Sequence, residues 1–204
     1  MAKIKLTKNE LKKKKDALKM YKRYLPTLQL KKQQLQMEIR GVEQRLSMLE
    51  EVKANLVHGF ESWIAVFAEE GSARDNNGLP LLRMTQIRTS VGNIAGVVIP
   101  VFDGAEFEID EYDLYLVPLW VDKAVELVKQ VLLADAEHQV VRAQRELLAK
   151  ELRITSQRVN LFEKVKIPET MMEIKQIGIY LGDQQTAQVV RGKISKKKVG
   201  EREQ

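Results

Sequence analysis

Few residues of this chain have the type and spacing that metal binding or covalent catalysis requires. The 204 residues include no cysteine, which excludes disulfides, thiolate nucleophiles and zinc fingers. The two histidines, His58 and His138, have no cysteine or carboxylate partner at metal-ligand spacing, and His58 falls on the outer side of an expected helix. Gly192-Lys193 lacks the glycine spacing and the preceding strand of a phosphate-binding loop.

The acidic residues between 103 and 113 do not build a recognisable site either. They lack the Asp-x-Asp-x-Asp-Gly frame of a calcium loop and are interpreted as a solvated loop or a docking patch for a basic partner. No combination of serine, histidine and aspartate has supporting context. We therefore expect a non-catalytic chain, without metal or cofactor, that serves as a binding or mechanical part.

Basic residues are concentrated at the two ends of the chain. Residues 1–40 hold 13 Lys or Arg against three Asp or Glu, residues 151–204 are also basic, and residues 41–150 are acidic. If the chain folds back on itself, the two basic ends lie together and the acidic middle forms the far end. Any single charge run is also explained by a solvated helix face. Without interleaved aromatics or a visible recognition module, nucleic acid is not an expected partner.

A heptad pattern from Ile4 to Phe67 organises the elements that carry these charges. Two series of residues, spaced by seven, are apolar at all but four positions, namely Thr7, Lys14, Lys32 and Lys53. The pattern predicts a long helix whose apolar stripe needs a partner helix along its length. A lysine on this seam tunes the register or the choice of partner.

The beginning of this helix is also readable. Thr7 and Glu10 form a capping box, and Leu6 and Leu11 are placed as a hydrophobic staple across it. Pro26 lies outside the seam and is expected to bend the helix without breaking it.

The residue pattern of the connector that follows predicts a β-hairpin. Residues 82–89 alternate in polarity and residues 94–102 are rich in β-branched side chains, with a turn expected over residues 90–93. Residues 103–113 are expected to form a loop with Gly104 in a turn. Because an isolated hairpin is marginal in water, this one should pack on the helices or on another chain.

A second helix is expected to begin between Tyr115 and Pro118, to be interrupted at Pro168 and to carry a basic tail beyond Gly182. The expected fold class is predominantly all-α, a long antiparallel two-helix coiled-coil hairpin with a short β-hairpin in the connector. The expected segments are residues 1–70 for the first helix, 71–113 for the connector and 114–204 for the second helix with its tail. A parallel homodimer through the first seam is the competing arrangement.

The second half of this helix carries a specific motif, Arg158-Val159-Asn160-x-Phe162-Glu163, followed by Ile167-Pro168. Together with Thr-Lys-x-Glu-Leu at residues 7–11, the motif resembles the D subunit of the V-type and A-type ATPases. Its family-motif positions are Arg158, Asn160, Glu163 and Pro168. The resemblance covers roughly residues 5–45 and 150–195, and the residues around Pro26 depart from the family pattern.

The resemblance implies the central rotor shaft of a rotary ATPase or ATP synthase that translocates protons or sodium ions. The implied partners are the catalytic A and B subunits, the small F subunit of the stalk and the d/C-type subunit of the membrane ring. Both termini would lie inside the catalytic hexamer. With no apolar run approaching the ~18 residues of a membrane span and no signal-peptide segment, we expect a cytoplasmic chain, peripheral to the inner face of the membrane.

Candidate contact residues follow from charge and from this implied arrangement. The expected contacts of the basic tip with the catalytic hexamer are Lys12, Lys13, Lys14, Lys15, Arg191, Lys193, Lys196, Lys197 and Lys198. The expected contacts of the hairpin with a stalk partner are Met84, Ile87, Ile94, Val98 and Val101. The alternative functions are a static coiled-coil adaptor or tether and, ranked lower, a basic nucleic-acid-binding coiled coil.

Overall fold

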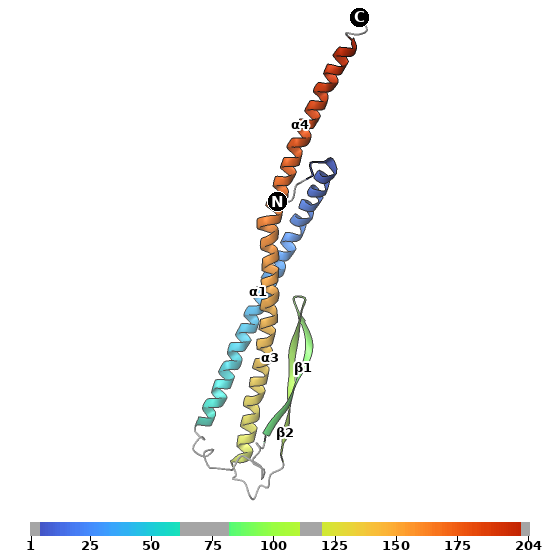
Figure 1. Cartoon of the computed structure of the whole chain (residues 1–204). Helices are drawn as coiled ribbons and strands as arrows, with labels where there is room; N and C mark the ends of the chain where they lie inside the picture. Colours follow the sequence, from blue (N-terminus) through green and yellow to red (C-terminus); the bar gives the residue numbers. More distant parts are fainter. Residues whose placement is uncertain (1–4, 62–81, 111–119, 201–204) are drawn as a thin grey trace. The chain divides into compact units, whose positions relative to one another are not determined.

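The computed structural model describes residues 5–61, 82–110 and 120–200. Its helices are α1 (Lys8–Glu61), α3 (Val121–Asn160) and α4 (Ile167–Gly200), with a π-helix, η1 (Leu161–Lys166), between the last two. The strands β1 (Leu82–Ile94) and β2 (Val97–Ile109) form one antiparallel sheet (Figure 1). The predominantly helical fold with a β-hairpin in the connector is therefore confirmed. The expected start of the second helix between Tyr115 and Pro118 lies outside the described residues.

The chain divides into two compact units, and each is described by itself. The terminal unit comprises Met1–Lys32 and Ile154–Gln204, and the middle unit comprises Gln33–Arg153. Each unit contains a part of α1 and a part of the returning helix.

In the middle unit the α1 seam packs against α3. Leu35 and Val42 of α1 join Val141 and Leu148 of α3 and Ile99 of β2 in one buried cluster. Polar side-chain contacts link the same two helices, namely the ion pairs Glu43–Arg145 and Lys53–Asp135 and, between them, the contact Glu50–His138. As the residue number rises along α1, it falls along α3. The helices are therefore antiparallel. Because α3 covers the α1 seam within one chain, the competing parallel homodimer is wrong.

In the terminal unit the beginning of α1 packs against α4 and the end of α3. The side chains of Val159 and Ile177 are buried here, and the Tyr21 ring lies 5.3 Å from the Phe162 ring, centroid to centroid. The Thr7 hydroxyl oxygen accepts a hydrogen bond of 3.3 Å from the Glu10 N–H, as the capping box predicts.

The interruption expected at Pro168 takes the form of the π-helix. The N–H of Ile167 donates to the carbonyl of Phe162, five residues earlier, so the backbone ring holds one residue more than an α-helical ring. Pro168, which has no N–H to donate, follows directly. Beyond it α4 runs to Gly200, so most of the expected basic tail is helical. Pro26 lies inside α1, which continues on both sides of it.

The hairpin is longer than the sequence predicted, and its turn lies elsewhere. Each strand has 13 residues. Ala95 and Gly96 make the turn with φ values of 51° and 78°, and the Asn93 side-chain oxygen accepts a hydrogen bond of 3.0 Å from the Gly96 N–H. Two consecutive positive φ values are those of a two-residue hairpin turn of the kind that matches strand twist. The turn expected over residues 90–93 was therefore wrong.

The loop expected from residue 103 was also wrong, because β2 continues to Ile109. Gly104 is in β2 with a φ of 134°, opposite Arg88, where the strand register shifts. That backbone conformation favours glycine, so this residue marks an irregularity inside a strand rather than a turn.

Candidate partner-binding surfaces

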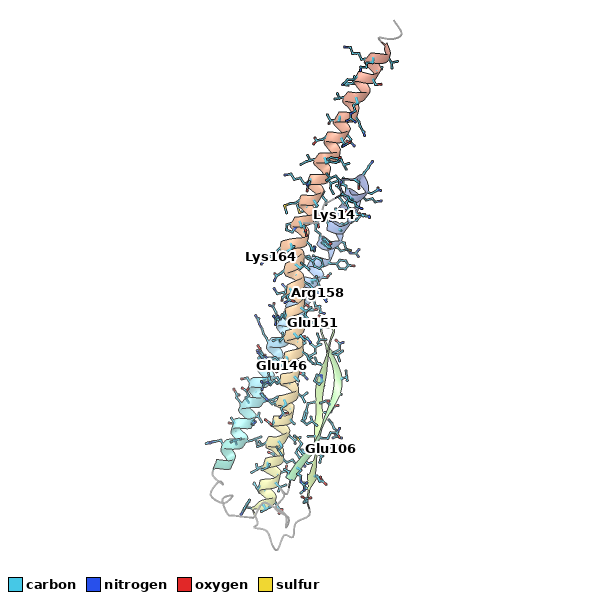
Figure 2. The ribbon with its side chains drawn as sticks, viewed as in Figure 1. Lys14, Glu106, Glu146, Glu151, Arg158 and Lys164 are labelled. Atoms are coloured by element: carbon cyan, nitrogen blue, oxygen red, sulfur yellow. The ribbon has the colours of Figure 1, made fainter. Side chains whose placement is uncertain are left out.

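Lys14 lies on the α1 seam of the terminal unit and is engaged within the chain. Its Nζ is 2.7 Å from a carboxylate oxygen of Glu173 on α4 (Figure 2). Hydrogen bonding to Glu173 raises the pKa of Lys14 above its ordinary 10.5, outweighing the opposing effect of partial burial. Lys14, one of the expected contacts with the hexamer, therefore holds α1 against α4.

The neighbouring lysines Lys12, Lys13 and Lys15 are exposed on α1. The cations of α4, from Arg191 to Lys198, are exposed as well. Leu6, just before α1, and Lys8, its first residue, lie near Leu181, so Arg191 stands ten residues, or roughly 15 Å, farther along α4. The two basic clusters thus lie toward the same end of this unit but at different positions along the α4 axis.

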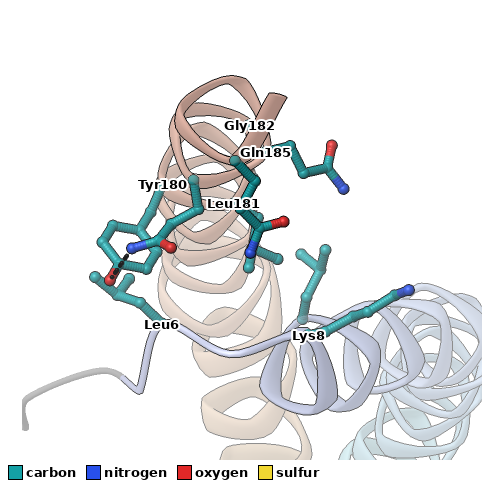
Figure 3. A pocket seen from close by; sticks show the side chains of 10 residues that line it. Leu6, Lys8, Tyr180, Leu181, Gly182 and Gln185 are labelled. Carbon is teal, nitrogen blue, oxygen red and sulfur yellow. Dashed lines mark hydrogen bonds between the residues drawn. The ribbon is translucent and has the colours of Figure 1, made fainter. Parts of the chain in front are cut away.

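Between the two basic clusters lies a groove of about 610 Å³, where the beginning of α1 meets α4 (Figure 3). Leu6, Lys8 and Leu11 form one wall, and α4 residues between Gly178 and Gln188 form the other. Gln184 donates a hydrogen bond of 3.0 Å to the Tyr180 hydroxyl oxygen. We call this feature the α1–α4 groove. Sequence reasoning missed it because its walls are brought together only by the pairing register of two distant segments.

In the middle unit the hairpin is anchored to the helices. Ile94 and Val97 pack against the buried cluster that contains Ile99. Gln144 of α3 donates a hydrogen bond of 2.6 Å to the carbonyl of Pro100. At the other end of the hairpin, Lys129 Nζ of α3 lies 5.7 Å from the centroid of the Phe107 ring.

The five expected stalk contacts do not share one face of the hairpin. Ile94 packs on the chain's own helices, and Val101 lies over Gly92 on the same side of the sheet as Ile99. Val98, which is 63% exposed, is on the opposite side of β2. Met84 and Ile87 are half-buried.

A residue that sequence reasoning missed lies on the same side as Val98. Val91 is 82% exposed and pairs with Pro100 across the sheet. We call Val91, Val98 and Pro100 the outer hairpin face. Successive side chains of a strand point to opposite sides of the sheet, and the position of the turn decides which residues pair across it. The sequence therefore predicts this face only once the turn is placed at Ala95.

The four family-motif residues lie within the π-helix of the terminal unit and on either side of it. Arg158, Asn160, Glu163 and Pro168 are all outside the buried core, and Figure 2 labels Arg158 at the end of α3. Phe162 of the motif contacts Tyr21 of α1 and Val159 is buried, so the motif combines apolar packing with an accessible polar surface.

The described part of the chain offers neither a metal site nor a membrane span. Within residues 5–61, 82–110 and 120–200, no cluster of three or more His, Cys, Asp or Glu could hold a metal ion. In the same ranges, no helix is apolar over a length that could cross a membrane.

A pair of long antiparallel helices with exposed surfaces for partners is typical of a structural subunit within a larger assembly. The chain matches the family model of the ATP synthase D subunit over residues 10–197. It is 52% identical over 199 residues to the V-type ATP synthase D subunit of Borreliella burgdorferi, covering 96% of this chain and 95% of the relative. The subunits of the same name in Chlamydia muridarum and Chlamydia pneumoniae are each 33% identical, over 96% of this chain and 96% and 93% of theirs. The chain belongs to the D-subunit family of ATP synthases.

Proposed function

We propose that this chain is the central rotor shaft of a V- or A-type rotary ATPase. It transmits torque between the catalytic A and B hexamer and the membrane ring that translocates protons or sodium ions. The observation that carries the proposal is the family match over residues 10–197. ATP binding and hydrolysis belong to the partner subunits, and this chain is non-catalytic.

The helix pairing supports a mechanical role. Torque tends to slide two paired helices past each other, and such sliding separates Lys14 and Lys53 from their carboxylate partners. Lys14–Glu173 in the terminal unit and Lys53–Asp135 in the middle unit oppose it. The buried cluster around Leu35 and Leu148 opposes it as well, because displaced side chains lose their packing.

The exposed cations of the terminal unit are the proposed contacts with the catalytic hexamer. Exposed ionic contacts are each worth at most about 1 kcal/mol, so the tip can exchange one set for the next as it turns. The outer hairpin face is the proposed contact with the small F subunit of the stalk or with the d/C-type subunit of the ring. Through these partners the chain stays at the inner face of the membrane.

The first test is a tagged pull-down from solubilised membranes of the native host. The expected result is recovery of the A and B subunits, in three copies each per copy of this chain, together with the small F subunit. Recovery of nucleic acid or of unrelated proteins, without ATPase subunits, would overturn the proposal.

A second test separates a rotor from a static tether. Because the chain has no cysteine, Lys13→Cys provides a single thiol that can be joined to an engineered cysteine in the hexamer. Oxidation is expected to stop ATP hydrolysis and reduction to restore it, because a locked shaft cannot turn. The same complex kept reduced is the control. Undiminished hydrolysis in the cross-linked complex would identify a tether.

A further inference from the structure

The α1–α4 groove combines three kinds of surface. Its apolar part is made by three leucines, Leu6 and Leu11 on one wall and Leu181 on the other. Its α4 side carries three amides, those of Gln184, Gln185 and Gln188. Lys8 places one cation at its edge (Figure 3).

Two glycines keep the α4 side of the groove open. A Cβ built on Gly178 or on Gly182 would meet no atom within 4 Å beyond the helix's own backbone and chain neighbours, so no contact in the described chain requires glycine at either position. Each glycine costs a helix interior about 1 kcal/mol relative to alanine. Glycine at such positions allows the backbone of another chain to come close to the helix.

We propose that the α1–α4 groove binds a loop of a partner protein in which an apolar side chain stands next to a carboxylate. The apolar side chain packs against the three leucines, the loop backbone pairs with the glutamine amides, and the carboxylate pairs with Lys8. The inference rests on the proposed function in one respect, that the catalytic hexamer supplies the loop.

Charge favours this occupant over the two others that the chain itself offers. The first 15 residues contain seven lysines and one acidic residue, Glu10. A second copy of this chain would bring another such basic end against Lys8. Residues 1–4 carry Lys3 and no acidic residue. A second copy of this chain and residues 1–4 would therefore each bring lysines close to Lys8. An acidic loop would instead neutralise the charge of Lys8.

The glycines provide the main test, with the full-length chain and the purified catalytic hexamer that lacks its central stalk as the probe. The double substitution Gly178→Ala and Gly182→Ala fills the space above the helix. It is expected to weaken binding about tenfold and to raise the midpoint of thermal unfolding, because alanine favours the helix. Loss of binding together with a gain of stability cannot be explained by misfolding.

Gly192→Ala is the matched control. This glycine is also on α4 and its Cβ would also meet nothing within 4 Å, but it does not line the groove. It should raise stability and leave binding unchanged. If the double variant bound the hexamer with wild-type affinity, this inference would be overturned and the proposed function would stand. If the unmodified chain did not bind the hexamer, the proposed function and this inference would both fail.

The lysine provides a second test with a control of equal charge. Lys8→Glu and Lys5→Glu change the net charge equally, but only Lys8 lines the groove. Lys8 is also the first residue of α1, where a carboxylate does not disfavour the helix. We expect Lys8→Glu to weaken hexamer binding several-fold more than Lys5→Glu. Equal losses would reduce the role of Lys8 to general electrostatic attraction and overturn the inference.

A photo-reactive phenylalanine analogue in place of Gln188 identifies the occupant in the assembled complex. An adduct with a hexamer loop that holds an apolar residue beside Asp or Glu supports the inference. An adduct with residues 1–4 of the same chain, or with a second copy of this chain, would overturn it.

Discussion

Lys14 and Lys53 occupy heptad positions where an unpaired cation lowers the stability of a coiled coil. Each meets a carboxylate of the returning helix, Glu173 at 2.7 Å and Asp135 at 2.5 Å. In a shifted register each lysine would lose this carboxylate partner. The two pairs therefore specify the register, and their net contribution to stability is small because both are partly exposed.

Asp135→Asn tests the second pair. Hydrogen bonding from Lys53 holds the pKa of Asp135 below its ordinary 3.8, so the ionised carboxylate stabilises the fold above that pH. This contribution is lost as the pH falls through the lowered pKa of the folded state. The free energy of unfolding of the variant should be about 1 kcal/mol lower than that of the wild type at pH 7. This difference should shrink below pH 3.8. Urea unfolding at a series of pH values, monitored by the circular dichroism of the helices, measures the loss of stability and its pH dependence.

Glu146→Gln is the control for this prediction. Glu146 forms an i,i+4 pair of 3.6 Å with Arg142, and both side chains are about two-thirds exposed. Its removal should change stability little at any pH. A loss for Asp135→Asn that persisted undiminished in acid would show that the carboxylate acts by packing and not by its charge.

At the scale of elements, the hairpin depends on Gly92. A Cβ at this position would lie 2.6 Å from Val101 Cγ2, which is too close for either side chain to remain in place. Gly92→Ala should therefore destabilise the hairpin by about 1–3 kcal/mol. Hydrogen exchange of the β1 and β2 amides is expected to accelerate, with the α3 amides unchanged.

Val91→Ala serves as the comparison in the same strand. Its side chain is 82% exposed, so its truncation should leave hydrogen exchange in the hairpin unaltered. Unchanged exchange in Gly92→Ala would mean that Val101 moves aside freely, and that the glycine is not needed for packing.

The helices of this fold were predictable, because the heptad positions of α1 and the apolar positions of α3 identify two stripes that cover each other. The hairpin was predictable only in outline. Gly92 suggested a turn, but it is a glycine because Val101 needs its space, and the positive φ of the turn falls partly on Ala95. A short apolar strand interrupted by glycine leaves the register undetermined by local sequence.

The candidate surfaces were less predictable than the elements. The heptad pattern places Lys14 on the seam and Lys12 off it, but only the antiparallel pairing shows that Glu173 engages Lys14 while Lys12 is exposed. Val98 and Ile94 were likewise grouped together, although Ile94 packs on the helices and Val98 is largely exposed. Both distinctions depend on contacts between residues far apart in the chain.

At the scale of the whole molecule, the exposed cations should control how fast the chain finds its partner. Replacing Lys12, Lys13 and Lys15 by glutamine is expected to lower the association rate with the catalytic hexamer about tenfold at low salt. The difference should largely vanish near about 0.5 M salt, where exposed charges are screened. Stopped-flow binding across a salt series measures it.

Replacement of Lys14 by glutamine should have a different signature, because this lysine is paired with Glu173. We expect lower thermal stability and little change in the association rate. If neutralising the three exposed lysines left the rate unchanged at every salt concentration, the basic surface would have no part in recognition.

The π-helix has a further consequence, for the lengths that this chain can tolerate. Deleting one residue from an α-helix turns everything beyond it by about 100° relative to its partner. Leu161–Lys166 already holds a surplus residue in its widened turns, so a deletion there can be absorbed by conversion to ordinary α-helix. The seam at Ile177 would keep its orientation. We therefore expect that this chain can lose one residue from this segment and keep the interface beyond it unchanged.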